Sequence, residues 1–479
     1  MVIRIVPCPG QGFLRKLESI PDKISLLLPG FCNFPIGNCW LRVSRAVRTL
    51  YRMPNRQLTN WKSRISQPQL KTGYFILEGL NSFATVYYLF YLYFFMQMAF
   101  GFGNKANLVL AAANGLIYMV GSFFAGRFAQ RFGYFKSLKL GFAVMLLGLG
   151  AGTHVGSAGG QIGVMAVMVL GMCFTWPPLE ALVSENEPPA GVQTMVGIYN
   201  VVWAGTGALA YFTGGAMLEK LGLKSLFYVP IAVQLSQLSL TIWLERQARA
   251  SVEARESRIK EQACCPAIHA TRSSAAMMHP AELNPRPIAK ARAFLAMAWL
   301  ANPFAYIAIN TLIAVMPGVA SRLGLSTTVA GFCCSIWCFA RLGAFWGLWR
   351  WSGWHYRFGW LAAAYLALTG TFAILVLAPN LAALALAQIV FGCALGLIYY
   401  SSLFYSMDLS QAKGEHGGIH EAAIGLGNFA GPAVGAATLH FLPQYTNGSA
   451  WAVSGLLLFG LGGLVAVWWK GKGPNPKSE

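Results

Sequence analysis

Residues 126–136 read GRFAQRFGYFK and form a short basic stretch between two long apolar runs, 107–125 and 138–158. Gly126 has no side chain, so two helices can approach closely there. Gly133 allows the chain to turn sharply and return into an apolar phase. Lysine and arginine mark the cytoplasmic side of membrane proteins. In and beside this stretch these residues are Arg127, Arg131, Lys136 and Lys139. The stretch therefore predicts a cytoplasmic loop between two membrane spans.

The composition is that of an integral membrane protein. Of the 479 residues, 56% are hydrophobic and 11% are charged, whereas about 25% are charged in soluble domains. Apolar runs of spanning length, about 20 residues, recur along the chain. They are continuous rather than alternating, which argues against a β-barrel. The formal net charge of +20 lies in loops and tails on one predicted side. We therefore expect these charges to meet membrane lipid, and we expect no nucleic-acid binding.

Twelve apolar segments have the length of a membrane-spanning helix. The predicted fold class is an all-α polytopic membrane protein with twelve transmembrane helices in two pseudo-symmetric six-helix bundles. We place the spans at 73–98, 107–128, 137–157, 160–183, 194–217, 224–244, 292–318, 327–349, 356–378, 380–406, 417–442 and 449–469.

These spans divide the chain into five parts. They are a basic cytoplasmic N-terminal extension (1–72), a first bundle (73–244), a cytoplasmic linker loop (245–291), a second bundle (292–470) and a cytoplasmic tail (471–479). The extension has two interpretations, a tail that touches lipid headgroups or a start assigned too early, with Met53 as an alternative start. Residues 245–261 of the linker have mixed charge and are a candidate for an amphipathic helix on the membrane surface.

The two halves match each other at a fixed offset. Adding 221 to a position in the first half brings Asn81, Phe83 and Ala84 onto Asn302, Phe304 and Ala305, and brings Gly126, Gly171, Gly197 and Gly214 onto Gly347, Gly392, Gly418 and Gly435. One offset that holds from the first span to the eleventh indicates an internal duplication. Parallel halves of this kind are typical of duplicated transporters.

The basic loop and the repeat together resemble the major facilitator superfamily. That family's loop between helices two and three reads G-x-x-x-D-[R/K]-x-G-[R/K]-[R/K]. The residues here that occupy or neighbour matching positions are Gly126, Ala129, Arg131, Gly133 and Lys136. Gln130 stands at the acidic position, so the charge contact of this loop with the neighbouring half is not expected. The resemblance implies a two-bundle transporter with alternating access. Its central cavity would be lined mainly by spans one, four, seven and ten.

Ionisable side chains inside spans are costly and therefore mark candidate functional sites. Those in the predicted spans are Glu78, Glu180, Arg341, His420 and Glu421, all in the cytoplasmic half. One interpretation is a cytoplasmic gate of ion pairs, with Glu180 as a member. The other is a substrate and proton site, in which Arg341 attracts an anionic group and His420 or Glu421 titrates.

Neutral polar and aromatic residues give further candidates for the substrate site. Asn81 and Asn302 occupy equivalent places in spans one and seven and would face the cavity or form interhelical hydrogen bonds. Tyr399 and Tyr400 in span ten could stack on a solute or belong to the core. Tyr199 and Asn200 in span five complete the set.

Glycines in spans five and eleven predict close helix packing. The stretches are GTGALAYFTGG at 205–215 and GNFAGPAVGA at 427–436. Small residues at four-residue spacing leave one helix face free for a neighbour. The positions assigned to packing are Gly205, Gly214, Gly427, Gly431, Pro432 and Gly435.

The predicted function is secondary active transport of a small organic solute, with a proton as one candidate coupling ion and with no enzymatic activity. The alternative is a transporter-like receptor, sensor or assembly protein that no longer transports. The sequence has no G-x-x-x-x-G-K-[S/T] nucleotide-binding motif. Its ten cysteines have no zinc-ligand spacing with histidine, so we expect neither a cofactor nor a metal. We expect a monomer in a bacterial inner membrane with both termini cytoplasmic.

Overall fold

A computed structural model describes residues 67–185, 187, 189–264, 288–409 and 413–471. In this part of the chain all regular structure is helical, and twelve helical segments are long and apolar enough to cross a membrane. The predicted fold class is therefore confirmed. Residues 1–66 of the predicted N-terminal extension and residues 265–287 of the predicted linker lie outside the described residues.

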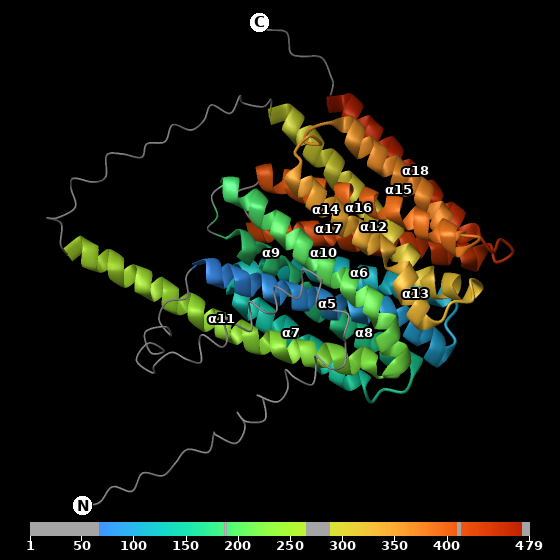
Figure 1. Ribbon diagram of the computed structural model, residues 1–479, viewed down its shortest axis with the longest axis horizontal. Coiled ribbons are helices and arrows are strands. Elements are labelled where there is room, and N and C mark those ends of the chain that lie inside the picture. Colours follow the sequence, from blue (N-terminus) through green and yellow to red (C-terminus); the bar gives the residue numbers. More distant parts are fainter. Residues whose placement is uncertain (1–66, 186, 188, 265–287, 410–412, 472–479) are drawn as a thin grey trace, which may run out of the picture. The chain divides into compact units, whose positions relative to one another are not determined.

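Helices of the first half are drawn from blue to yellow-green in Figure 1. They are α5 (Gln67–Phe100), α6 (Asn104–Phe132), α7 (Tyr134–Gly152), α8 (Ala158–Cys173), α9 (Trp176–Ser184), α10 (Pro189–Lys220) and α11 (Ser225–Cys264). The fourth span consists of α8 and α9 together. Pro177 and Pro178 lack the N–H groups that would continue the α8 hydrogen-bond ladder, so a new helix begins there.

Helices of the second half follow from yellow to red. They are α12 (Ile288–Arg322), α13 (Thr327–Cys334), α14 (Ile336–Arg350), α15 (Phe358–Val376), α16 (Leu381–Leu409), α17 (Lys413–Phe441) and α18 (Gly448–Gly471). The eighth span breaks at Ser335, between α13 and α14. Gln388 of α16 forms hydrogen bonds with the backbone at this break. Its Nε2 donates to Cys333 O (2.8 Å) and its Oε1 accepts from Trp337 N (3.4 Å).

The duplication is visible in the helix boundaries. Corresponding spans of the two halves begin 221 to 224 residues apart along the chain. The predicted surface helix over 245–261 is instead continuous with the sixth span, because α11 runs unbroken to Cys264. Glu245 accepts from Lys139 Nζ (2.7 Å) and from Arg249 Nη2 (2.6 Å), which ties α11 to the start of α7.

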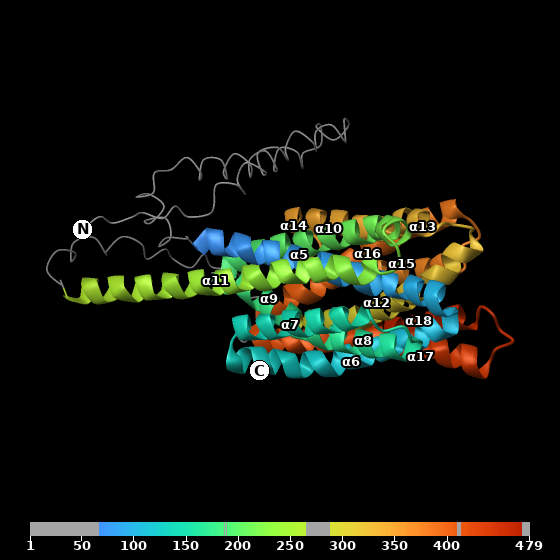
Figure 2. The same cartoon turned by 90° about the horizontal axis from the view of Figure 1, so that it is seen from below.

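The two halves touch through glycines. Along α6 and α17, which lie side by side in Figure 2, a Cβ on Gly115 or Gly425 would strike the backbone of the other helix. A Cβ on Gly418 would lie 3.0 Å from the Cα of Gly126. A Cβ on Gly331 of α13 would likewise lie 3.3 Å from the Cα of Gly215 of α10. Backbones can approach this closely only where side chains are absent.

The halves meet at both ends of the bundle. We call the end that carries Gly133 the loop end. Gly126 and Gly418 meet toward that end. At the opposite end, Lys105 Nζ lies 3.0 Å from His440 Nδ1, and Thr328 N donates to Glu219 Oε2 (2.8 Å). Passage of a solute between the halves therefore requires one set of contacts to separate.

The predicted packing glycines differ in their contacts. Gly427 and Gly431 face α12, where a Cβ would meet Pro303 O and Ile307 O, while Gly435 faces Leu108 of α6. Gly214 faces Tyr87 and Tyr91 within its own half. Gly205 is less tightly packed, because a Cβ added there would lie 3.7 Å from the side chain of Leu342. Pro432 lies inside α17.

Candidate functional site

A cavity of about 140 Å³ lies between the halves. Its walls come from α5, α6, α8, α9 and α10 of the first half and from α12, α14, α16 and α17 of the second. The lining thus includes spans two, five, eight and eleven in addition to the expected spans one, four, seven and ten. Seven of its 19 lining residues are aromatic, namely Phe90, Tyr118, Trp176, Trp203, Tyr306, Trp337 and Tyr399.

Arg341 contributes a positively charged side chain to this wall. It is buried, with 6% of the residue exposed. Its guanidinium carbon lies 4.5 Å from the ring centroid of Trp203 and 4.8 Å from that of Trp337. Its Nε has no hydrogen-bond partner. Among the described residues no carboxylate forms an ion pair with Arg341. Cation–π contacts compensate only part of the lost hydration of a guanidinium, so this group can still bind an anion.

Glu421 is the acidic group of the same wall. Tyr118 of α6 donates its hydroxyl to Glu421 Oε2 at 2.5 Å. Around it, donor atoms of Glu180, His420 and Glu421 all lie within 4.8 Å of one another. We call these three residues the acidic cluster. It joins α9 of the first half to α17 of the second.

Glu78 of α5 lies near the acidic cluster and has no solvent exposure. Its carboxylate lies close to the Tyr199 hydroxyl. The carboxyl groups of Glu78 and Glu421 are also close enough to Glu180 to disfavour a negative charge there. Of the five predicted ionisable residues, four therefore gather around one point near the loop end. The structure brings carboxylates together there, and no ion pair connects them to Arg341 in the part of the chain that it describes.

Of the other candidate residues, some line the cavity and others form hydrogen bonds behind its wall. Tyr399 lines the cavity and contacts Trp203, with ring centroids 5.2 Å apart. Asn200 accepts from Trp203 Nε1 (3.0 Å) and so orients that ring. Asn81 donates to Thr175 Oγ1 (3.3 Å) across two helices.

Asn302, Tyr199 and Tyr400, like Asn81 and Asn200, do not line the cavity. Asn302 is buried and its side-chain polar atoms have no hydrogen-bond partner, whereas the hydroxyl of the buried Tyr199 lies close to Glu78. Tyr400 packs against Phe345 and Trp354, with ring centroids 6.0 and 5.7 Å away.

Several residues of the wall escaped the sequence analysis. Asn310 donates a hydrogen bond to Asn428, and both line the cavity. The repeat gave no signal for Asn310, because Leu89 stands 221 positions before it. Asn428 has only Gly207 at the equivalent place.

The basic loop has the predicted turn. Gly133 has φ of 99°, a backbone conformation that favours glycine, and Arg131 and Lys136 beside it are exposed. Gln130 accepts from the hydroxyl of Tyr134 in its own loop, at 3.4 Å.

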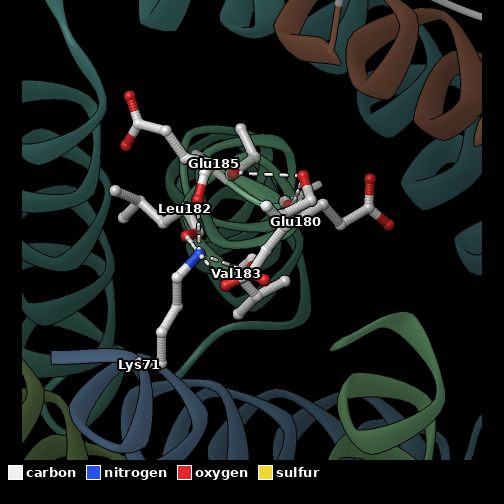
Figure 3. Close-up of polar contacts among 8 residues, drawn as sticks. Lys71, Glu180, Leu182, Val183 and Glu185 are labelled. Carbon is white, nitrogen blue, oxygen red and sulfur yellow. Dashed lines mark hydrogen bonds and ion pairs between the residues drawn. The ribbon is translucent and has the colours of Figure 1, made fainter. Parts of the chain in front are cut away.

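Lys71 closes the loop end of α9 beside the acidic cluster. Its Nζ donates to the carbonyls of Leu182 (3.1 Å), Val183 (2.8 Å) and Glu185 (2.6 Å). A cation placed there satisfies carbonyls that a helix end leaves free. Figure 3 shows the Glu180 carboxylate pointing to the other side of the helix from the Lys71 amine.

Comparison with known proteins identifies the family. The model of the Major Facilitator Superfamily matches residues 24–211 and 109–432, so the chain belongs to this superfamily of membrane transporters. A search of curated proteins finds no match.

Solved structures share the fold. They include a mutant of the nucleoside transporter NupG (TM-score 0.55, 14% identity, 84% of this chain and 98% of that chain) and a mutant of the peptide transporter POT (0.58, 15%, 84% and 94%). A third is the human organic anion transporter MFSD10, or TETRAN (0.57, 14%, 84% and 100%). At such identities the likeness concerns the fold alone.

Proposed function

We propose that the protein is a secondary active transporter that moves a small organic solute by alternating access. The observation that carries this proposal is the cavity between the halves, which presents one buried cation, Arg341, in a wall that includes seven aromatic residues. Because the halves meet at both ends, rocking that separates one end at a time would expose the cavity to one side of the membrane and then to the other.

The wall suits a solute with an anionic group and a flat or apolar body. A guanidinium binds carboxylate, phosphate or sulfonate in a planar two-point contact. Trp203 and Trp337 hold the guanidinium of Arg341 on their faces. Tyr306 and Tyr399 offer rings and hydroxyls in the same wall. The small volume of about 140 Å³ favours a metabolite of modest size.

Coupling of transport to a cation gradient would pass through Glu421. Its carboxylate lines the cavity that Arg341 lines and also belongs to the acidic cluster. A change in its charge would alter the field in which an anionic solute binds. Proton-driven uptake would appear as solute accumulation in proteoliposomes when a pH gradient is imposed, and the absence of any dependence on the gradient would exclude it.

The alternative is a protein of this fold that senses or assembles without transport. Gln130 in place of the family's acid favours it, because Gln130 is engaged by Tyr134 in its own loop. Saturable binding of a solute without any flux would support this alternative.

We further propose a monomer in a bacterial inner membrane, with the loop end and both termini in the cytoplasm. The exposed Arg131 and Lys136 at the loop end support this orientation. A green fluorescent protein fused to the C-terminus should fluoresce if this end is cytoplasmic, and a dark, exported fusion would reverse the assignment.

A panel of solutes tests the binding site. We expect an organic anion, but no neutral sugar or cation, to raise the melting temperature of the purified protein in proportion to the logarithm of its concentration. Arg341→Ala should abolish the shift. Arg350→Ala is the matched control, because Arg350 lies in the same helix, is exposed and stacks on Trp346. An equal shift in both variants would refute the role of Arg341.

A further inference from the structure

The acidic cluster brings α9 and α17 together at one buried point, and Glu78 of α5 lies beside it. Glu180, His420 and Glu421 are exposed by 5%, 6% and 4%, and Glu78 beside them is fully buried. Carboxylates in an apolar medium are strongly unfavourable unless a cation or a proton accompanies them. These groups therefore need either protons, which Glu180 and Glu421 can share in a hydrogen bond, or a bound cation.

The basic side chains nearby do not fill this role. Arg341 is held between Trp203 and Trp337 and forms no ion pair within the described part of the chain. Lys71 donates to carbonyls at the end of α9, and the Glu180 carboxylate points to the opposite side of that helix. A cation that accompanies the acidic cluster would therefore have to come from solution.

The donor atoms have the composition and spacing of a metal site. One carboxylate oxygen from each of Glu180 and Glu421 and one ring nitrogen of His420 lie within 4.8 Å of one another. Three donors held at about 2.1 Å from one ion are about 3.4–3.6 Å apart. Each donor would therefore have to move inward by up to about 0.8 Å for all three to share an ion.

Buried polar atoms without hydrogen-bond partners also indicate a ligand site at the acidic cluster. Glu180 Oε1 and His420 Nε2 are buried without a hydrogen-bond partner. A buried imidazole nitrogen and a buried carboxylate oxygen that lack hydrogen-bond partners destabilise the folded protein unless a ligand binds to them. Glu421 is oriented by the Tyr118 hydroxyl (2.5 Å), as the carboxylate ligands of metal sites are oriented by a second hydrogen bond.

We propose that Glu180, His420 and Glu421 bind a divalent first-row transition-metal ion, such as Mn²⁺ or Zn²⁺, that connects the two halves of the transporter. Carboxylates alone would suit Mg²⁺ or Ca²⁺, but imidazole shifts the preference to Mn²⁺, Fe²⁺ or Zn²⁺. The ion reaches the site from the cavity, since Glu421 lines both. This inference does not depend on which solute the cavity accepts.

The site would have a mechanical consequence. Glu180 belongs to α9 and the other two ligands belong to α17, so a bound ion holds the halves together toward the loop end. Opening of that end would then require the ion to leave or to lose a ligand. Metal binding at carboxylates and imidazole also displaces protons, so the two cations compete for the same groups.

Manganese titration of the purified full-length protein tests the site. Mn²⁺ is the first probe because it avoids thiols, and free cysteines are present in the spans. We expect one equivalent of tightly bound Mn²⁺ per chain by electron paramagnetic resonance, with nitrogen hyperfine coupling from an imidazole, and displacement by Zn²⁺ but not by a hundredfold excess of Mg²⁺.

Matched variants locate the ion. Glu180→Gln and His420→Gln should each weaken Mn²⁺ binding at least tenfold. His440→Gln should leave it unchanged, because His440 lies in the same helix but is exposed and contacts Lys105. Wild-type protein that binds no Mn²⁺ or Zn²⁺ would overturn the proposal, even if the buried variants failed to fold. Unchanged binding in folded Glu180→Gln would overturn it too.

Discussion

At the residue scale, the sequence predicted which ionisable groups lie in the membrane, but not how they pair. Arg341 and the acidic residues were predicted as candidates because charges inside spans are rare. Whether they meet as ion pairs or as like charges depends on helix rotation. Glu180 and Glu421 are 241 residues apart in sequence (421 − 180), and only the fold brings α9 against α17.

A hydrogen bond behind the cavity wall gives a testable consequence at this scale. Asn200 Oδ1 accepts from the buried Trp203 Nε1 at 3.0 Å, and Trp203 supports Arg341. Asn200→Ala should destabilise the protein, since it leaves this donor unsatisfied, at a cost of about 1–3 kcal/mol.

A double-mutant cycle isolates that bond. In a Trp203→Phe background, which has no indole N–H, the additional cost of Asn200→Ala should fall by about 1 kcal/mol in reversible unfolding measurements. Strictly additive effects would show that Asn200 does not hold the ring.

At the scale of elements, helix breaks illustrate what sequence can and cannot predict. In the fourth span, α8 ends shortly before Trp176, Pro177 and Pro178, where α9 begins. The two prolines predict this break from the sequence. The eighth span breaks at Ser335 without proline or glycine at the break. Gln388 from another helix supplies the bonds that make this break tolerable, and a contact so distant in sequence leaves no local pattern.

The glycine contact between α6 and α17 should be intolerant of side chains. A Cβ on Gly425 would meet the backbone of Met119, so Gly425→Val should lower stability by about 1–3 kcal/mol or prevent the halves from meeting. Gly462→Val in α18 is the control, because a Cβ there meets nothing within 4 Å. Equal melting temperatures for the two variants would contradict the close contact.

At the scale of the whole molecule, the repeat predicted the architecture well. One offset gave two equivalent bundles, and corresponding spans do begin 221 to 224 residues apart. The cavity wall was predicted less completely, because α6, α10, α14 and α17 also contribute to it. Helices that are apolar on nearly every side give no periodic signal for the face that turns toward the cavity.

The proposed function requires that an anionic solute bound at Arg341 crosses the membrane. The most direct measurement is uptake of a radiolabelled solute, chosen as the strongest binder of the panel, into proteoliposomes that contain the purified protein. We expect saturable uptake that is at least tenfold lower with Arg341→Ala and unchanged with Arg350→Ala. Binding of the solute without uptake by the wild-type protein would contradict the claim and favour a sensor built on a transporter fold.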